Sequence, residues 1–354
     1  MRSRRIFYDL LILAFITIFS HLLLSTVTDL VPKFAKNRLY DTVESSTKNT
    51  GGNLNTALTE FAKESIKNTT YNFLTENDLE VRVVASNRGN GYLLQTVGFL
   101  LEQQNHARFS IKICNTEMTG FDDLRFLKEY FEVYPIWSNL SHSNLNTSLY
   151  KESIDYFNCL EVDTRSRFVI LLEDDSVVVD SFTDLVDSFT DLIKSLIQHL
   201  DRNGEIDYVK LYHPKKLRKI PFYPLIISFS LLMSFSVWIC FRKPNFFYFL
   251  FYALILTYSL FKAGSEFPAE LRYYITSSAY VSVPESCCTP AVIFRSSRIP
   301  KMVDYFRNSA AYSGHAKDHI LDESPFVGRM SDMNYVIHIG AYSVVRNRHV
   351  LFTD

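Results

Sequence analysis

Residues 168–172 form an apolar run, Phe-Val-Ile-Leu-Leu, that leads directly into three acids, Glu173, Asp174 and Asp175. A short apolar run of this kind is typical of a buried strand. Three carboxylates directly after it are unfavourable unless they face solvent, a cation or a hydrogen-bonding ligand. Carboxylate oxygens suit hard divalent cations, chiefly Mg²⁺ or Mn²⁺ that bridge to phosphates. The alternative is a turn or capping cluster, and the surrounding pattern has to decide between the two.

Strands and helices are expected to alternate around this run. Residues 80–86 predict a strand that ends in a polar loop at 87–91, and a helix follows with these residues on one face: Leu93, Leu94, Val97, Leu100 and Leu101. Similar patterns predict helices at 122–131 and 148–160 and strands at 109–114, 133–136, 273–283, 291–294 and 335–339. The alternation indicates an α/β domain with a mostly parallel sheet. Ligands of such sheets bind just beyond the carboxyl ends of the strands, where Arg88, Asn115 and the acidic triplet stand.

Three apolar stretches stand apart from this pattern. The first, 6–24, follows a basic cluster and is long enough to cross the roughly 30 Å hydrocarbon core as a helix. We expect an uncleaved anchor with the basic residues in the cytosol and the rest of the chain in the lumen; the alternative is a cleaved signal peptide. The other two, 221–241 and 246–261, are joined by a polar turn and predict a membrane hairpin. A buried hairpin in a soluble core is the alternative.

The predicted organisation has six segments. They are a cytosolic tail at 1–5, a transmembrane anchor at 6–28, a stem at 29–78, a first domain part at 79–219, a transmembrane hairpin at 220–262 and a second domain part at 263–354. The final part is too short to fold alone, so we expect both parts to form one domain. The basic residues at 215–219 outnumber those in the hairpin turn and would favour the opposite orientation, but the first anchor usually decides.

A lumenal location is consistent with the sequons and the cysteines. Glycosylation is expected at Asn68, Asn139 and Asn146. Four of the five cysteines would lie in an oxidising lumen and allow three pairings. We prefer a Cys114–Cys159 bridge together with a Cys287–Cys288 bridge; the alternative is that some are free and buried. Lys and Arg (37) nearly balance Asp and Glu (38), so the charge gives no indication of nucleic-acid binding.

Three further residues are candidates for the chemistry. His338 ends an apolar strand and would complete the metal shell or contact a diphosphate, although a lone histidine there is more often structural. Asp318 and Asp322 are spaced to share one helix face, and either could take the proton of an acceptor hydroxyl. Helix-capping or solvated acids are the alternative for this pair.

The stretches Val81–Arg88 and Tyr92–Val97 resemble the donor-binding start of GT-A glycosyltransferases. The segment that leads from Lys151 into the acidic triplet resembles their metal motif, and His338–Gly340 resembles their late strand. This resemblance implies a GT-A-like sheet, a metal at Asp175 with Glu173 and His338, and these donor-binding residues: Val84, Ser86, Arg88, Asn115, Lys151, Glu173 and Asp174. The hairpin inserted between the triplet and the C-terminal strands is similar to that of the Golgi family that adds N-acetylgalactosamine to GPI anchors.

Membership of that family would imply a multi-pass Golgi membrane enzyme with a lumenal catalytic domain. It would transfer N-acetylgalactosamine from UDP-GalNAc to the first mannose of the glycan of GPI-anchored proteins, with inversion and with Mn²⁺ (or Mg²⁺). One alternative is an N-glycan branching N-acetylglucosaminyltransferase, for which a soluble tethered domain would suffice. The other is a non-catalytic membrane scaffold or transporter subunit, which the lack of charged groups inside the apolar stretches disfavours.

Overall fold

The structure is a computed structural model. It describes residues 38–68, 78–104, 109–138, 145–179, 189–214, 222–240, 246–263, 267–284, 288–313, 316–340, 342–343 and 348–349. The predicted anchor at 6–28 lies outside these residues, as do Asn139 and Cys287.

Helices and strands alternate through most of the described chain. Up to the hairpin they are α2 (Arg38–Thr50), α3 (Leu54–Asn68), β1 (Leu79–Ala85), α4 (Tyr92–Gln104), β2 (Ser110–Asn115), α5 (Asp122–Leu127), β3 (Val133–Pro135), α6 (Leu145–Glu161), β4 (Phe168–Glu173), β5 (Ser176–Val178), α7 (Phe189–Arg202) and β6 (Tyr208–Lys210). From the hairpin on they are α8 (Phe222–Cys240), α9 (Phe246–Ala263), α10 (Phe267–Thr276), β7 (Val281–Ser282), β8 (Ala291–Arg295), η2 (Ser296–Arg298), α11 (Ile299–Ser313), α12 (Lys317–Asp322), β9 (Gly328–Ser331), β10 (Val336–His338), β11 (Tyr342–Ser343) and β12 (Arg348–His349).

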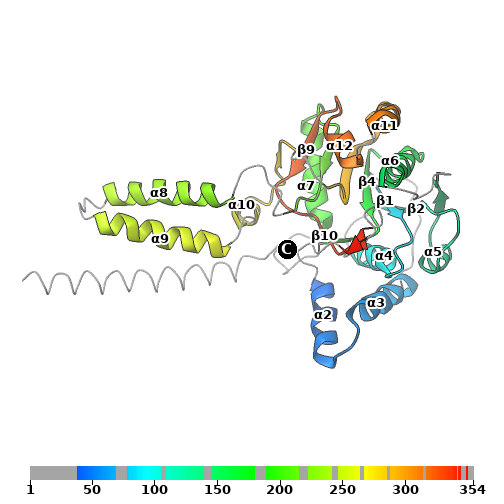
Figure 1. Cartoon of the computed structure of the whole chain (residues 1–354), viewed down its shortest axis with the longest axis horizontal. Coiled ribbons are helices and arrows are strands. Elements are labelled where there is room, and N and C mark those ends of the chain that lie inside the picture. The colour runs from blue at the N-terminus through cyan, green and yellow to red at the C-terminus, as the bar shows by residue number, and fades with distance from the viewer. Residues whose placement is uncertain are drawn as a thin grey trace, which may run out of the picture. The chain divides into compact units, whose positions relative to one another are not determined.

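The chain divides into two compact units. One unit combines residues 1–33 with 215–276, and its described part contains α8, α9 and α10. Helices α8 and α9 lie side by side as an antiparallel pair, which is the predicted hairpin (Figure 1). Large apolar side chains are exposed along both helices, including Leu232 and Leu254. Among the described residues, no helix has both the length and the apolar character needed to cross a membrane.

The second unit combines residues 34–214 with 277–354 around an eight-stranded sheet. The strand order is β3-β2-β1-β4-β8-β6-β9-β7. The first four strands run parallel, β8 runs antiparallel to both β4 and β6, and β9 is again parallel to β6. The predicted mixed α/β fold with a largely parallel sheet is therefore present. Because β1 and β4 are adjacent and parallel, the loop at 86–91 and the acidic triplet leave the same edge of the sheet.

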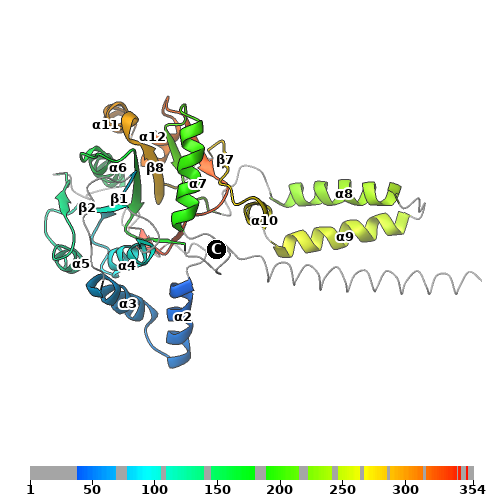
Figure 2. The same ribbon diagram turned by 180° about the vertical axis from the view of Figure 1, so that it is seen from behind.

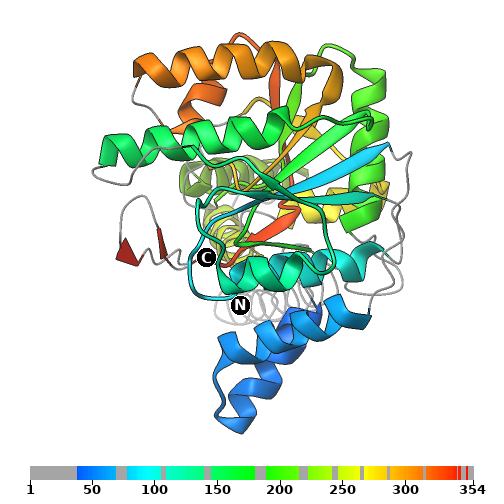
Figure 3. The same ribbon diagram turned by 90° about the vertical axis from the view of Figure 1, so that its right-hand side faces the viewer.

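Helices cover both faces of this sheet, as Figure 3 shows. On one face α6 packs against α11, and aromatic rings such as Phe157 and Phe306 stack in the core between them. On the other face α4 packs against α3, with Gly98 against Ala62 at the crossing (Figure 2). The leucines and Val97 predicted for the inner face of α4 are buried. Helix α3 therefore belongs to the core of this unit, although the sequence predicted it as part of a separate stem.

Two further predictions can be compared with the structure. Cys114 and Cys159 form a disulfide that joins the end of β2 to α6, as predicted. Cys288 is also disulfide-bonded, but the predicted partner lies outside the described residues, so that pairing stays a prediction. The predicted strand at 273–283 is wrong, because Tyr273 to Thr276 form the end of helix α10 and only Val281–Ser282 are a strand. The amphipathic period of α10 was masked by its aromatic and β-branched residues, which favour strands.

Candidate active site

The acidic triplet occupies the end of β4 and the turn into β5. The side chains of Asp174 and Asp175 are buried, whereas Glu173 is partly exposed. Strand β10 pairs with β5 so that His338 lies opposite Ser176, and the backbone N–H of Ile339 donates to the carbonyl of Asp175 at 2.9 Å. This pairing brings a histidine from the far end of the chain to the triplet.

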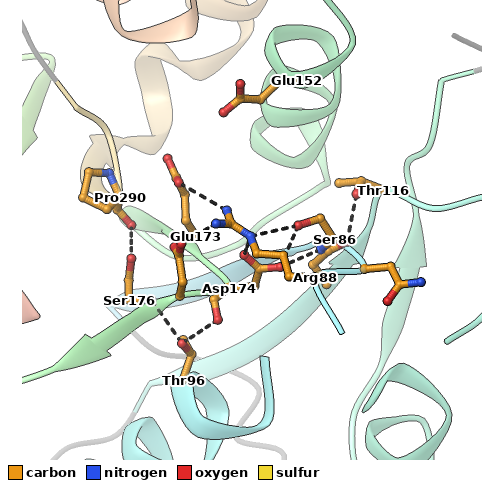
Figure 4. Close-up of polar contacts among 12 residues, drawn as sticks. Ser86, Arg88, Thr96, Thr116, Glu152, Glu173, Asp174, Ser176 and Pro290 are labelled. Carbon is orange, nitrogen blue, oxygen red and sulfur yellow. Dashed lines mark hydrogen bonds and ion pairs between the residues drawn. The ribbon is translucent and has the colours of Figure 1, made fainter. Parts of the chain in front are cut away.

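Arg88 lies in the middle of the three acids (Figure 4). Its Nε is 2.8 Å from Asp174 Oδ1, its Nη1 pairs with Asp175 Oδ2, and its Nη2 is 3.8 Å from Glu173 Oε2. The arginine side chain is 16% exposed, so these ion pairs are formed largely away from water. The sequence predicted Arg88 and the triplet at the same sheet edge, and in the structure they are in direct contact.

Asp174 is held in place by the residue that follows β1 and by a residue of α4. The backbone N–H and the hydroxyl of Ser86 donate to Asp174 Oδ2 at 2.9 and 2.7 Å. The hydroxyl of Thr96 donates to the backbone carbonyl of Asp174 at 2.8 Å and accepts from the N–H of Ser176 at 3.1 Å (Figure 4). Asp174 therefore orients the turn, which leaves Glu173 and Asp175 as the triplet members available to a metal.

Glu173, Asp175 and His338 could hold a metal ion, since each offers one ligand atom and these atoms lie within 4.8 Å of one another. His338 Nε2 is 3.2 Å from Asp175 Oδ2. The other oxygen, Asp175 Oδ1, is buried and accepts no hydrogen bond within the described part of the chain. A buried carboxylate oxygen without a donor needs another source of positive charge. Two carboxylates and an imidazole also match the ligand preferences of Mn²⁺ and similar divalent ions, so these residues fit the predicted metal.

The electrostatics of the site separate its two aspartates. Burial raises the pKa of Asp174 to about 6, against the opposing effect of Arg88. Burial also acts on Asp175, but there Arg88 and His338 outweigh it and hold the pKa of this carboxyl below its ordinary value. Burial lowers the pKa of His338, yet the neighbouring Asp175 raises it by more. Asp175 is therefore ionised at neutral pH, as a metal ligand must be.

Lys317, at the start of α12, forms a second contact of the triplet that the sequence did not predict. Its Nζ is 3.2 Å from Glu173 Oε1, pairs with Glu152 of α6, and lies over the ring of Tyr156. Burial lowers the pKa of Lys317, but Glu152 and Glu173 raise it by more, so the lysine stays charged. In the sequence, Lys317 was marked only by its position next to the base candidate Asp318. Its contact with Glu173 arises because α12 packs beside α6.

Gly340 fits closely against Asp175. A Cβ atom on Gly340 would overlap with the carboxylate of Asp175. The turn after β10 thus approaches the site so tightly that only a glycine leaves the aspartate its position. Nothing in the sequence pattern predicted this role for Gly340.

Other predicted donor-binding residues have structural contacts. Asn115 bonds through its side chain to the backbone of Glu117 and shapes the loop after β2. Lys151 is buried, donates to the carbonyl of Thr116 at 3.0 Å and pairs with Asp155. The side chain of Val84 packs against the core that α6 and α11 share. Val84 lies opposite Glu173 in the pairing of β1 with β4, whereas the contacts of Asn115 and Lys151 do not reach the triplet.

The two predicted base candidates lie in different environments. Asp318 is partly exposed, directly follows Lys317, and accepts a hydrogen bond from the N–H of Cys288 at 3.2 Å. Asp322 is mostly buried and pairs with the fully buried Lys210 of β6 at 2.5 Å. The structure thus brings Asp318 close to the residues that contact the triplet and places Asp322 in an interior ion pair. Of the predicted sequons, Asn68 is exposed at the end of α3 and Asn146 lies in the first turn of α6.

Residues 79–338 match the family model of GPI-N-acetylgalactosamine transferase PGAP4. The match covers more than half of the chain and includes Arg88, the acidic triplet, Lys317 and His338, and it ends before Ile339 and Gly340. This chain belongs to the GPI-N-acetylgalactosamine transferase family. It is therefore a glycosyltransferase related to GPI anchors, and the resemblance noted in the sequence is confirmed at the family level. The matched range spans the hairpin of α8 and α9.

Proposed function

We propose that this protein transfers N-acetylgalactosamine from UDP-GalNAc to the first mannose of GPI anchors, with inversion and with Mn²⁺ as its metal. The observation that carries the proposal is the grouping of Glu173, Asp175 and His338 within the region that matches the family. When bound, a divalent cation would stabilise the negative charge that develops on the diphosphate leaving group.

The protein's own residues would bind the cation, hold the turn in place and supply the general base. Glu173, Asp175 and His338 would hold the cation, while Ser86 and Thr96 keep the turn in place through Asp174. Direct displacement at the sugar carbon requires a base that takes the proton of the acceptor hydroxyl. Asp318 is our candidate, because it is partly exposed and lies next to Lys317. Asp322 is less suitable, because its carboxylate is already paired with Lys210.

We also propose that the protein works in the Golgi lumen and is attached to the membrane through the α8–α9 hairpin. The apolar side chains exposed along both helices support a lipid contact there. Attachment would raise the effective concentration of a lipid-linked acceptor. Cleavage by an N-glycosidase at Asn68, Asn139 or Asn146 would support the lumenal location, and three unmodified sequons in secretory cells would contradict it.

The experiment that tests the activity uses the purified full chain with Mn²⁺, a panel of UDP-sugars that includes UDP-GalNAc and UDP-GlcNAc, and a GPI-anchored acceptor. We expect that UDP-GalNAc is the one UDP-sugar of the panel from which the sugar is transferred. We also expect NMR to show that the anomeric configuration of the transferred sugar is inverted relative to the donor. The Asp175→Ala variant should be inactive, whereas Asp122→Ala, an exposed acid on α5, should match the wild type. Transfer by Asp175→Ala at the wild-type rate would contradict the proposal, and preference for UDP-GlcNAc would favour the branching alternative.

A further inference from the structure

Arg88 binds each carboxylate of the triplet with a different nitrogen. Nε contacts Asp174, Nη1 contacts Asp175, and Nη2 faces Glu173. Burial alone would lower the pKa of Arg88, but the three acids raise it well above its ordinary value. The guanidinium is therefore the main positive charge that now neutralises the triplet, together with Lys317 at Glu173.

The same oxygen atoms are the natural ligands of a divalent cation. Asp175 Oδ2 contacts Arg88 and is also 3.2 Å from His338 Nε2, so it lies within the group of potential metal ligands. A guanidinium and a divalent cation repel each other at such distances, and in a buried site the repulsion is only weakly screened. A cation that is coordinated by both Glu173 and Asp175 is thus incompatible with the contacts that Arg88 makes with these carboxylates.

The loop that carries Arg88 has open space directly after the arginine and is anchored two to three residues further on. Arg88 is followed by Gly89 and Gly91, both with positive φ (+69° and +67°), which are conformations that glycine adopts without strain. A Cβ on Gly89 would meet nothing within 4 Å, so there is open space directly after Arg88, whereas a Cβ on Gly91 would overlap with Thr59 and Asn55 donates to the carbonyl of Asn90 at 2.7 Å. An arginine that is released here stays at the same sheet edge, and its fork of donors suits a phosphate.

We propose that Arg88 and the divalent cation exchange at the acidic triplet. The guanidinium holds the three carboxylates together until the cation binds, and it then turns to the diphosphate of the donor. Arg88 is thus a positioning residue for the metal site as well as a donor contact. This inference rests on the proposed function, because it takes Glu173, Asp175 and His338 as the metal ligands.

The test measures Mn²⁺ binding to the full chain by electron paramagnetic resonance, without nucleotide, and UDP binding by calorimetry with Mn²⁺ present. We expect Arg88→Gln to bind Mn²⁺ about tenfold more tightly or better, since a positive charge is removed beside the site, and to bind UDP more weakly. Arg88→Lys keeps the charge and should bind Mn²⁺ like the wild type. The matched control is Arg125→Gln, which removes an exposed charge on α5 and should change neither affinity.

The outcomes separate the inference from the proposed function. If the wild type binds Mn²⁺ and Arg88→Gln binds it equally or more weakly, the exchange is refuted while the metal site stands. If neither protein binds Mn²⁺, the metal site itself is refuted, and the exchange with it. Should Arg88→Gln fail to fold, the Arg88→Lys variant tests the exchange. The exchange predicts that this variant binds UDP more weakly than the wild type and binds Mn²⁺ with the same affinity. Weaker binding of both UDP and Mn²⁺ would contradict the exchange.

Discussion

Two arginines, one buried within β1 and one partly exposed just after it, show how the site differs from the rest of the core. Arg82 lies within the strand, is fully buried, and binds Glu80 at 2.5 Å and the carbonyls of Cys159 and Leu160 at 2.7 and 2.8 Å. Arg88 lies six residues further on and faces three carboxylates. Burial lowers the pKa of Arg82 because Glu80 compensates only in part, whereas the acids around Arg88 outweigh burial and raise its pKa.

The difference is one of charge balance. Around Arg82, two positive groups including Lys112 meet one carboxylate and the partly negative C-terminal end of helix α6. Around Arg88 and Lys317, two positive groups meet four carboxylates, those of Glu152 and the acidic triplet, and even a protonated His338 beside Asp175 would leave an excess of negative charge. The first cluster, formed by Arg82, Lys112 and Glu80, is nearly balanced in charge and stabilises the core. The second cluster, formed by Arg88, Lys317, Glu152 and the acidic triplet, carries an excess of negative charge that a divalent cation would offset. This excess, and not burial as such, distinguishes the site.

The largest expected effect is that of removing charge from the second cluster. Asp175→Asn keeps the shape of the side chain but removes a metal ligand and a partner of Arg88. We expect kcat to fall by about 10³-fold or more, because loss of the cation forfeits several kcal/mol of transition-state stabilisation. Steady-state kinetics with UDP-GalNAc and a GPI-anchored acceptor measure this. If kcat of Asp175→Asn stays within tenfold of the wild-type value, the second cluster does not act through a bound cation, and the contrast between the two clusters has no functional meaning.

The converse change in the first cluster should affect stability alone. Arg82→Met leaves Glu80 buried with less compensation, and we expect the free energy of unfolding to fall by about 3 kcal/mol. Urea denaturation followed by circular dichroism measures the loss. The affinity for Mn²⁺ of the folded variant should equal that of the wild type; a change in that affinity would mean that the two clusters are not independent.

A smaller effect is expected from crowding the site without changing its charge. Gly340→Ala places a methyl group against the carboxylate of Asp175 and should weaken Mn²⁺ binding about tenfold, which corresponds to roughly 1.4 kcal/mol. Gly204→Ala is the matched control, since its Cβ would meet nothing within 4 Å. Equal Mn²⁺ affinities in the two variants would show that the turn after β10 does not shape the metal site.

The smallest effect concerns pH. The pKa of His338 is raised and that of Asp174 is about 6, so both groups bind protons as the pH falls below neutral. A proton on either group opposes a cation, and the affinity for Mn²⁺ should therefore rise severalfold between about pH 5.5 and pH 7.5. Calorimetry at a series of pH values measures this. His338→Gln should flatten the profile, and an affinity that falls with rising pH would have the wrong sign.

Much of the site could be predicted because it follows from strand ends. The apolar run at 168–172 predicted β4, and parallel strands bring the loop after β1 to the same edge. His338 was predicted because it ends an apolar strand, although its partner strand β5 was not expected. Hydrophobic periodicity carries this information locally.

The residues that were missed depend on packing between distant segments. Glu152 and Lys317 meet only because α6 and α12 pack together, and neither has a spacing that marks it. Thr96 and its neighbour Gln95 were polar residues between the apolar positions of α4, which was a signal that could have been used. The attachment of α3 to α4 was likewise hidden, because the closeness of Gly98 and Ala62 is visible only in three dimensions.

The central claim is that the second cluster carries an excess of negative charge and that a divalent cation binds there and neutralises it. Titration of the purified full chain with Mn²⁺, followed by the resonance signal of the free ion, tests it most directly. We expect one Mn²⁺ per chain in the wild type and in Arg82→Met, and none in Asp175→Asn. Absence of binding to the wild type, or unchanged binding to Asp175→Asn, would contradict the account.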